Sequence, residues 1–289
     1  RSGLYVYGMG ILKVKKPKYI MIENVKGLIQ KKFIDDFYSI ITELVELGYN
    51  CYYPKKDNGQ PTCLNAKDFG IPQNRERIFV ICIRKDINNN CNYDFPIGFD
   101  SGIRLKDILE ESVDEKYYLN KPWHMSTETD ERHDTNEIAQ IEGINYKATR
   151  SITDINLYCR TIDTMGGGQR EPKVLVTTNK LNQIGELDLK GYNDFSKRIY
   201  DIEGIGRTLM SSGGNLSDKA GQYLTKEFRI RRLTAKECWR LMGFSDEHFE
   251  KAKAIGISDS SLYKQAGNSI VVNVLYYIFK NLFSEYIVK

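Results

Sequence analysis

The sequence lacks the patterns that mark several classes of protein. None of its six cysteines belongs to a Cys-x-x-Cys pair, and His124, His133 and His248 lie near no cysteine cluster, so a zinc site or a disulfide framework has little support. No apolar run approaches the ~18 residues needed to cross a bilayer, and the N-terminus has no signal-peptide layout. We therefore expect a cytoplasmic protein with reduced thiols.

Charge of neither sign dominates the chain. Lys and Arg number 42 against 38 Asp and Glu, and the resulting net charge of +4 does not by itself establish a polyanionic partner. Basic residues gather locally: residues 1–33 hold eight Lys or Arg and one acid, whereas residues 101–150 are acidic and residues 226–236 are basic again. Hydrophobic residues make up 41% of the 289 positions, which is enough to bury a core.

Helix and strand patterns alternate over the first hundred residues. The apolar runs at 19–22 and 78–83 are typical of buried strands. Between them, apolar residues recur at helical spacing from Ile34 to Val45, and Gly48 is a candidate C-cap. Strands alternating with a helix predict an α/β fold.

The rest of the chain divides into two further parts. Residues from about 101 to 225 are rich in Gly, Thr, Asn and charge, which predicts a smaller domain of strands and loops. Helical patterns then return, with a capping box at Thr234 and Glu237 and a final helix expected from about Ser269. We therefore expect domains at 1–100, 101–228 and 229–289.

Three short polar segments could carry chemistry. Glu23-Asn24-Val25 directly follows the first apolar strand, at the kind of strand end where ligands bind in open α/β sheets. Gln73, Arg75 and Arg77 are spaced by two and share a face in extended backbone, which suits a phosphate or a base-edge acceptor. The segment 265–269, Gln-Ala-Gly-Asn-Ser, stands before the last helix and could meet the carboxylate of a ligand.

Each of these segments also has a plain structural interpretation. A lone Glu after a strand is more often a helix N-cap or a surface ion pair. The two arginines could form a salt-bridged strand entrance, and Asn or Ser before a helix is usually only a cap. Taken singly, none of the three segments decides the function.

A weak internal repeat lies in the middle of the chain. Arg160-Thr161-Ile162 followed by three glycines at 166–168 is echoed by Arg207-Thr208-Leu209 followed by Gly213 and Gly214. Two such hairpins would each expose a glycine turn where a backbone can approach a partner closely. Chance similarity between turn-rich segments explains the repeat about as well.

Together, the segments resemble the C-terminal part of a cytosine-5 DNA methyltransferase. Residues 17–25 are similar to the sixth conserved motif of that family, and "NAKDFGIPQNRER" at 65–77 is similar to the stretch that ends in the eighth. Residues 231–244 resemble the ninth motif and residues 265–269 the tenth. All four occur in family order with family-like gaps. The resemblance implies part of a Rossmann-like sheet that uses S-adenosylmethionine, plus a smaller, β-rich target recognition domain.

The resemblance also assigns residue roles. Glu23, with Asn24 beside it, would contact N3 and the exocyclic amine of a flipped cytosine. Arg77 would hold the O2 atom of that base, with Arg75 on DNA phosphate or supporting the loop. A second set of residues would bind the cofactor and duplex DNA: Asn268 and Ser269 near S-adenosylmethionine, Arg207, Thr208, Gly213 and Gly214 in the recognition loop, and Arg231 and Arg232 against phosphate.

The chemistry of the reaction requires these residue types. Cytosine C5 is not nucleophilic until a thiolate adds at C6, and the negative charge that then develops on the ring must be relieved. A carboxylic acid at N3 and a guanidinium at O2 relieve it. The base must leave the helical stack to be reached.

Two family elements do not occur in the sequence. No cysteine directly follows a proline, and no Phe-x-Gly-x-Gly loop is found, so we expect motifs I to IV, with the catalytic Cys, to come from another chain or segment. Three explanations stay open: half of a split enzyme, a fragment of a single-chain enzyme, or a degenerate DNA-binding module without catalysis. An Arg-rich α/β protein for another anionic ligand is a further alternative. The abundance of Lys, Ile, Asn and Tyr suggests a bacterial or phage origin.

Overall fold

The computed structural model describes most of the chain and divides it into two compact units. The residues described are 3–87, 92–126, 136–165, 170–177, 183–186, 198–201, 222–224 and 228–284. The first unit comprises Arg1–Glu110, Asn156–Arg170 and Thr234–Lys289, and the second comprises Glu111–Ile155 and Glu171–Leu233. Residues 101–110 and 156–170, which the sequence pattern assigned to the β-rich domain, belong to the first unit, and residues 229–233 belong to the second.

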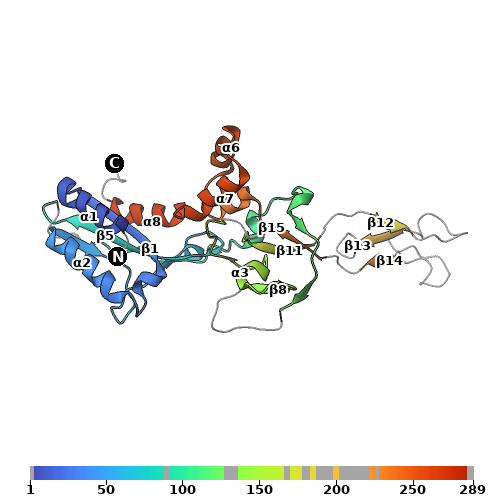
Figure 1. Cartoon of the computed structure of the whole chain (residues 1–289), viewed down its shortest axis with the longest axis horizontal. Coiled ribbons are helices and arrows are strands. Elements are labelled where there is room, and N and C mark those ends of the chain that lie inside the picture. The colour runs from blue at the N-terminus through green and yellow to red at the C-terminus, as the bar shows by residue number, and fades with distance from the viewer. Residues whose placement is uncertain are drawn as a thin grey trace, which may run out of the picture. The chain divides into compact units, whose positions relative to one another are not determined.

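An antiparallel sheet of four strands forms one part of the first unit (Figure 1). Strand β5 (Glu76–Arg84) lies between β1 (Tyr19–Val25) and β2 (Tyr49–Tyr52), and β3 (Leu64–Asn65) also pairs with β5. The antiparallel register corrects one prediction. Glu23 lies within β1, opposite Phe79 of β5, and does not follow the carboxyl end of a parallel strand.

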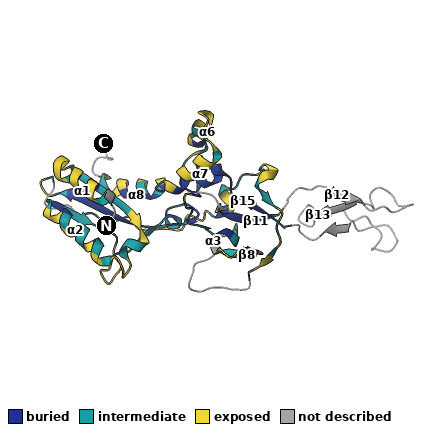
Figure 2. Cartoon of the chain, in the orientation of Figure 1, coloured by how far each residue is buried: buried dark blue, intermediate teal, exposed yellow. Residues whose placement is uncertain are grey.

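Two helices pack with this sheet. Helix α2 (Ile34–Glu46) buries Phe37 and Leu44 in a core shared with α1 (Gly3–Lys15) and the strands. The outer faces of both helices are exposed (Figure 2). Gly48 takes a φ of +92° directly after α2, which confirms its predicted place at the helix end. The buried members of this core are Met9, Ile20, Phe37, Leu44, Tyr49, Ile78, Val80 and Cys82.

The first unit also contains short elements and a group of C-terminal helices. The short elements are η1 (Lys26–Ile29), η2 (Ala66–Asp68), β4 (Gln73–Asn74), η3 (Leu105–Ile108) and β10 (Cys159–Arg160). The C-terminal helices are α5 (Ala235–Arg240), α6 (Asp246–Ala254), α7 (Asp259–Asn268) and α8 (Val272–Leu282). None of the helices in the described ranges is long and apolar enough to span a membrane.

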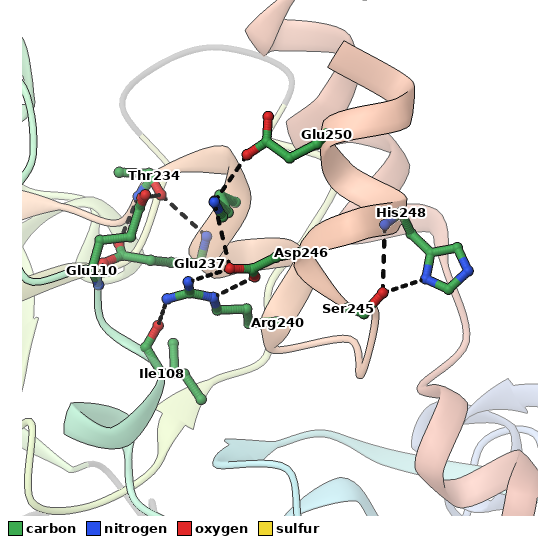
Figure 3. Close-up of polar contacts among 10 residues, drawn as sticks. Ile108, Glu110, Thr234, Glu237, Arg240, Ser245, Asp246, His248 and Glu250 are labelled. Atoms are coloured by element: carbon green, nitrogen blue, oxygen red, sulfur yellow. Dashed lines mark hydrogen bonds and ion pairs between the residues drawn. The ribbon is translucent and has the colours of Figure 1, made fainter. Parts of the chain in front are cut away.

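The predicted capping box at the start of α5 is confirmed. The Thr234 hydroxyl accepts from the backbone N–H of Glu237, and the Glu237 carboxylate accepts from the N–H of Thr234 at 2.8 Å. Figure 3 shows that the same carboxylate accepts from the N–H of Glu110, while Arg240 joins Ile108 to Asp246. The box therefore anchors Glu110, and Arg240 anchors Ile108, at the end of the first segment of this unit.

The end of α7 corrects the prediction for residues 265–269. Asn268 is the last residue of α7, and Ser269 is its C-cap, with the hydroxyl donating to the Gln265 carbonyl at 2.6 Å. Helix α8 begins at Val272 with Val271 as N-cap. The segment therefore ends one helix instead of beginning the next, and its polar residues do not form an N-terminal anion site.

The second unit is rich in strands, as predicted. Its larger sheet has the order β6-β15-β11-β9-β8-β7 and encloses a core of Ala139, Ile141, Ile152, Leu175 and Ile230. Its elements are η4 (Glu115–Tyr117), β6 (Tyr118–Leu119), β7 (Trp123–Met125), β8 (Glu137–Ile141), α3 (Lys147–Arg150), β9 (Ser151–Thr153), β11 (Lys173–Thr177) and β15 (Phe228–Arg232). A smaller sheet has the order β12-β13-β14 and comprises β12 (Gln183–Glu186), β13 (Arg198–Asp201) and β14 (Gln222–Leu224).

Candidate active site

Glu23 and Arg77 form an ion pair across two neighbouring strands. Arg77 of β5 lies opposite Val25 of β1, two residues from Glu23 and on the same face of the sheet. The Arg77 Nε is 2.9 Å from Glu23 Oε1, and the two side chains are 17% and 22% exposed. The pair is therefore mostly shielded from water yet still reachable from it.

The pair borders a small cleft. Its volume is about 10 Å³, roughly the room that one water molecule needs. The cleft is lined by Glu23, Leu64, Arg75, Arg77, Phe79, Ile270, Val271 and Val274. Charged groups thus stand against an apolar wall, an arrangement that strengthens their electrostatic effect on a bound group.

The ion pair leaves one acceptor atom of Glu23 and one donor atom of Arg77 unused. Arg77 uses its Nε for Glu23 and one terminal nitrogen, Nη1, for the carbonyl of Glu76 at 2.8 Å. Within the described part of the chain, the other terminal nitrogen of Arg77 and the second oxygen of Glu23 make no hydrogen bond. A planar ligand with alternating acceptor and donor atoms along one edge could bind both.

Arg75 has a structural role beside this pair. Its side chain is buried, and its guanidinium donates to the carbonyls of Ile162, Gly267 and Ser269 at 2.8, 3.1 and 2.9 Å. Burial, and then the neighbouring charge of Arg77, lower the pKa of Arg75 to about 10. Of the two predicted roles, support of the loop agrees with these contacts, and contact with DNA phosphate does not.

We expect Arg75→Lys to lower the free energy of unfolding by roughly 2–4 kcal/mol, because one ammonium cannot replace two terminal nitrogens, of which Nη1 binds one carbonyl and Nη2 binds two. Chemical denaturation of the variant and of the wild type measures the difference. Arg84→Lys, at the other end of β5, is the control, since Arg84 binds Asp86 and the carbonyl of Lys16 at the surface, where such contacts contribute little. Equal decreases in the two variants would contradict the role given to Arg75.

Gly267 permits a close approach of two segments of the first unit. A Cβ at this position would lie 1.9 Å from the carbonyl oxygen of Asp163 and 2.7 Å from the Cα of Thr164. Only a residue without a side chain fits between α7 and this backbone. Gly267 thus lets residues 162–164 lie close to α7, where Arg75 binds the carbonyl of Ile162.

The first copy of the weak repeat belongs to the same packed region. Strand β10 pairs in parallel with β4, and the Thr161 hydroxyl donates to the Asn74 carbonyl at 2.6 Å. The Gln73 side chain accepts from the N–H of Ile162 and donates to the carbonyl of Leu241. Residues 160–162 therefore brace the loop before β5. The three glycines that follow them lie outside the described residues.

Asn24 lies on the other face of β1 from Glu23, because successive side chains of a strand alternate. Its side-chain oxygen accepts from the N–H of Val25 at 2.8 Å, and the residue is exposed. The structure therefore does not bring Asn24 into the cleft with Glu23 and Arg77, contrary to its predicted place in the catalytic group.

The two residues assigned to S-adenosylmethionine do not form a cofactor pocket by themselves. The hydroxyl of Ser269 already donates to Gln265, and the exposed side chain of Asn268 is the one polar group left for a ligand. A cofactor with a carboxylate, an amine and a nucleoside needs more partners than this. The described residues therefore do not show a fit to the cofactor.

The residues predicted to bind DNA differ in their burial and in their contacts. Arg231 is 2% exposed, with Nη1 donating to the carbonyl of Arg232, so its predicted contact with phosphate is not compatible with its burial. Arg232 is partly exposed, donates to the carbonyl of Lys116 and lies 3.7 Å from Glu171. The four residues of the predicted recognition loop, Arg207, Thr208, Gly213 and Gly214, lie outside the described residues.

The apolar wall of the cleft was not predicted from the sequence. Phe79 continues the alternation of Arg75 and Arg77 on one face of the strand, and this signal could have placed it beside Glu23. Val271 and Val274 come from the start of α8, and no local pattern links that helix to β5.

Solved structures with a similar fold are methyltransferases. The Dnmt2 methyltransferase of S. pombe matches with a TM-score of 0.53 and 18% identity over 99% of this chain and 74% of its own. A putative DNA modification methyltransferase encoded within an E. coli prophage matches with a TM-score of 0.52 and 16% identity, covering 97% and 73%. The fold is therefore that of an α/β methyltransferase.

The family follows from the sequence comparisons. The family model described as C-5 cytosine-specific DNA methylase matches residues 1–284, so the chain belongs to this family of DNA (cytosine-5) methyltransferases. Among its relatives, the orphan methyltransferase M.SPBetaI of Bacillus phage SPbeta is 32% identical over 327 residues, covering 100% of this chain and 71% of the relative. The type II methyltransferase M.HhaI of Haemophilus parahaemolyticus is 31% identical, covering 95% and 66%.

Proposed function

We propose that Glu23 and Arg77 bind the edge of a target cytosine that has left the DNA helix, in an enzyme that methylates C5 of that base. The observation that carries this proposal is the ion pair at 2.9 Å in a cleft, with an oxygen and a terminal nitrogen left over. The edge of cytosine presents an amine, N3 and O2 in a row, which an acid and a guanidinium can match.

In this mechanism Glu23 shares a proton with N3 and accepts a hydrogen bond from the exocyclic amine. Arg77 donates to O2. Both interactions strengthen as a thiolate adds at C6 and negative charge spreads over the ring, so they stabilise the transition state more than the ground state. The pair also holds Glu23 in position before the base arrives. S-adenosylmethionine enters the proposal from family membership alone, as the source of the methyl group.

We also propose that a chain or segment carrying motifs I to IV, with the catalytic Cys, completes the pocket. The cleft has room for little more than one water, so it can accommodate only the edge of a base. Strand β1 ends the order of its sheet, and α1 exposes Val6, Tyr7, Ile11 and Val14. An edge strand can pair with a strand from another segment, and that segment can also cover the exposed apolar face of the neighbouring helix.

The second unit, whose sequence includes Thr208 and Gly213, is the proposed target recognition domain for duplex DNA. We expect Thr208→Ala or Gly213→Ala to change which sequence is methylated, because each base pair that is no longer matched costs about 1–3 kcal/mol of binding free energy. Methylation of a DNA library followed by bisulfite sequencing measures the preference. An unchanged preference in both variants would place recognition elsewhere in the chain.

Salt dependence of duplex binding tests the DNA role as a whole. If the chain contacts several phosphates, the logarithm of the binding constant should fall linearly and steeply with the logarithm of salt concentration, because bound counterions are released. A filter-binding titration at several salt concentrations measures the slope. Binding that is indifferent to salt would contradict a DNA role and favour a different anionic ligand.

A further inference from the structure

Two free cysteines lie next to each other on neighbouring strands of the first unit, on the face of the sheet away from the candidate active site. Cys51 of β2 lies directly opposite Cys82 of β5. Cys82 is fully buried in the core with Val80, and Cys51 is partly buried at the edge of the same core. Arg77 and Phe79 point to the other face of β5, because their numbers differ from 82 by odd intervals.

The register makes this pair close enough to bond. The N–H of Lys85 donates to the carbonyl of Gly48 at 2.9 Å, and these two residues lie one position beyond the pair Tyr49–Arg84 at which the ladder begins. Hydrogen-bonded and non-hydrogen-bonded pairs alternate along an antiparallel ladder, so Cys51 and Cys82, three positions further, are a non-hydrogen-bonded pair. Such pairs have Cα atoms about 4.5 Å apart, which lies within the range that a disulfide spans.

The two thiols are also unlike each other. A hydrogen bond from the Cys82 thiol lowers the pKa of Cys51, and the same bond together with burial raises the pKa of Cys82. A partly exposed sulfur with the lower pKa thus lies next to a buried one. This is the arrangement of an attacking thiol with a resolving thiol.

We propose that Cys51 and Cys82 form a reversible oxidation site that takes hydrogen peroxide as its oxidant. The Cys51 thiolate attacks one peroxide oxygen, the O–O bond breaks, and the released hydroxide takes up a proton to leave as water. The Cys82 sulfur then attacks the sulfenic sulfur, the S–O bond breaks, and a second water leaves with the Cys82 proton. Two thiols and one peroxide give one cross-strand disulfide and two waters, so the thiols are oxidised and the peroxide is reduced.

This site is separate from the cytosine cleft. Closure of the disulfide joins β2 to β5 on the core side and leaves the contacts of Glu23 and Arg77 unchanged. The proposed chemistry therefore diverts an oxidant into a bond that a thiol reductant can reverse, and keeps Cys51 from oxidation beyond the sulfenic acid.

Peroxide treatment of the folded chain, followed by alkylation in denaturant and peptide mass spectrometry, tests the proposal. We expect a linked pair of peptides containing Cys51 and Cys82, reversed by dithiothreitol, and abolished in Cys51→Ser. Cys63→Ser is the matched control: Cys63 is also partly buried, but burial raises its pKa to about 11, so this variant should form the linkage as the wild type does. Recovery of both thiols in reduced form, linkage of Cys51 to another cysteine, or conversion of Cys51 to sulfinic acid while Cys82 stays free would each overturn the proposal.

Because Cys51→Ser could also weaken the sheet, the free energy of unfolding of the reduced wild type and of Cys51→Ser is measured in parallel. Similar values, together with absence of the linkage in the variant, support the assignment. If Cys82→Ala retained the same extent of disulfide formation at Cys51, the pairing across the strands would be wrong.

Discussion

Glu23→Gln is expected to lower the rate of methyl transfer by about 10²–10⁴-fold in the complete enzyme, with little change in the affinity for duplex DNA. An amide can still occupy the position beside Arg77, but it cannot give a proton to N3, and proton transfer by a positioned acid contributes an acceleration of this size. Single-turnover methylation and equilibrium DNA binding, measured on the same preparation, separate the two effects.

Glu76→Gln is the matched control for this prediction. Glu76 is adjacent to Arg77 in sequence, but its carboxylate pairs with Lys26 at the surface and is 40% exposed. Its replacement should leave turnover close to that of the wild type. Unimpaired turnover in Glu23→Gln would remove Glu23 from the mechanism.

The second large effect is expected from Gly267→Ala, which should lower the free energy of unfolding by about 3 kcal/mol or more. The new Cβ would lie 1.9 Å from a backbone oxygen of Asp163, and no rotamer change can relieve a clash with backbone. Overpacking of this kind forces backbone shifts. Chemical denaturation followed by circular dichroism measures the decrease.

Gly10→Ala supplies the contrast. No heavy atom lies within 4 Å of a Cβ at Gly10 in helix α1, so this change should be neutral or stabilise the helix by up to ~1 kcal/mol. If Gly267→Ala were as stable as Gly10→Ala, the packing of α7 against residues 163 and 164 would not be as the structure has it. Displacement of the carbonyls around Arg75 in Gly267→Ala would also be expected to reduce turnover.

The features that could be predicted from the sequence are those that depend on local sequence patterns. The apolar runs placed β1 and β5, and the spacing of two between Arg75 and Arg77 put both on one face. The capping box at Thr234 is a signal confined to four residues, and its geometry is confirmed. Family motifs indicated that Glu23 and Arg77 belong to one site, and the structure brings them into contact.

The parts that were not predictable depend on contacts between distant segments. Nothing local to Arg75 indicates that three carbonyls, from residues 162, 267 and 269, surround it. The direction of β1 relative to β5 is likewise a property of the whole sheet, so the rule for parallel strand ends misplaced Glu23. The predicted place of residues 265–269 at a helix start was wrong, because a cap before one helix and a cap after another use the same residue types.

A structure of the protein in complex with target duplex DNA, together with the segment that carries the nucleophile, tests the central claim most directly. We predict a single cytosine turned out of the helix, with N3 and the exocyclic amine at the Glu23 carboxyl group and O2 at the Arg77 guanidinium. A cytosine bound at another place, or one that stays in the helix while Glu23 and Arg77 remain paired only with each other, would contradict this claim.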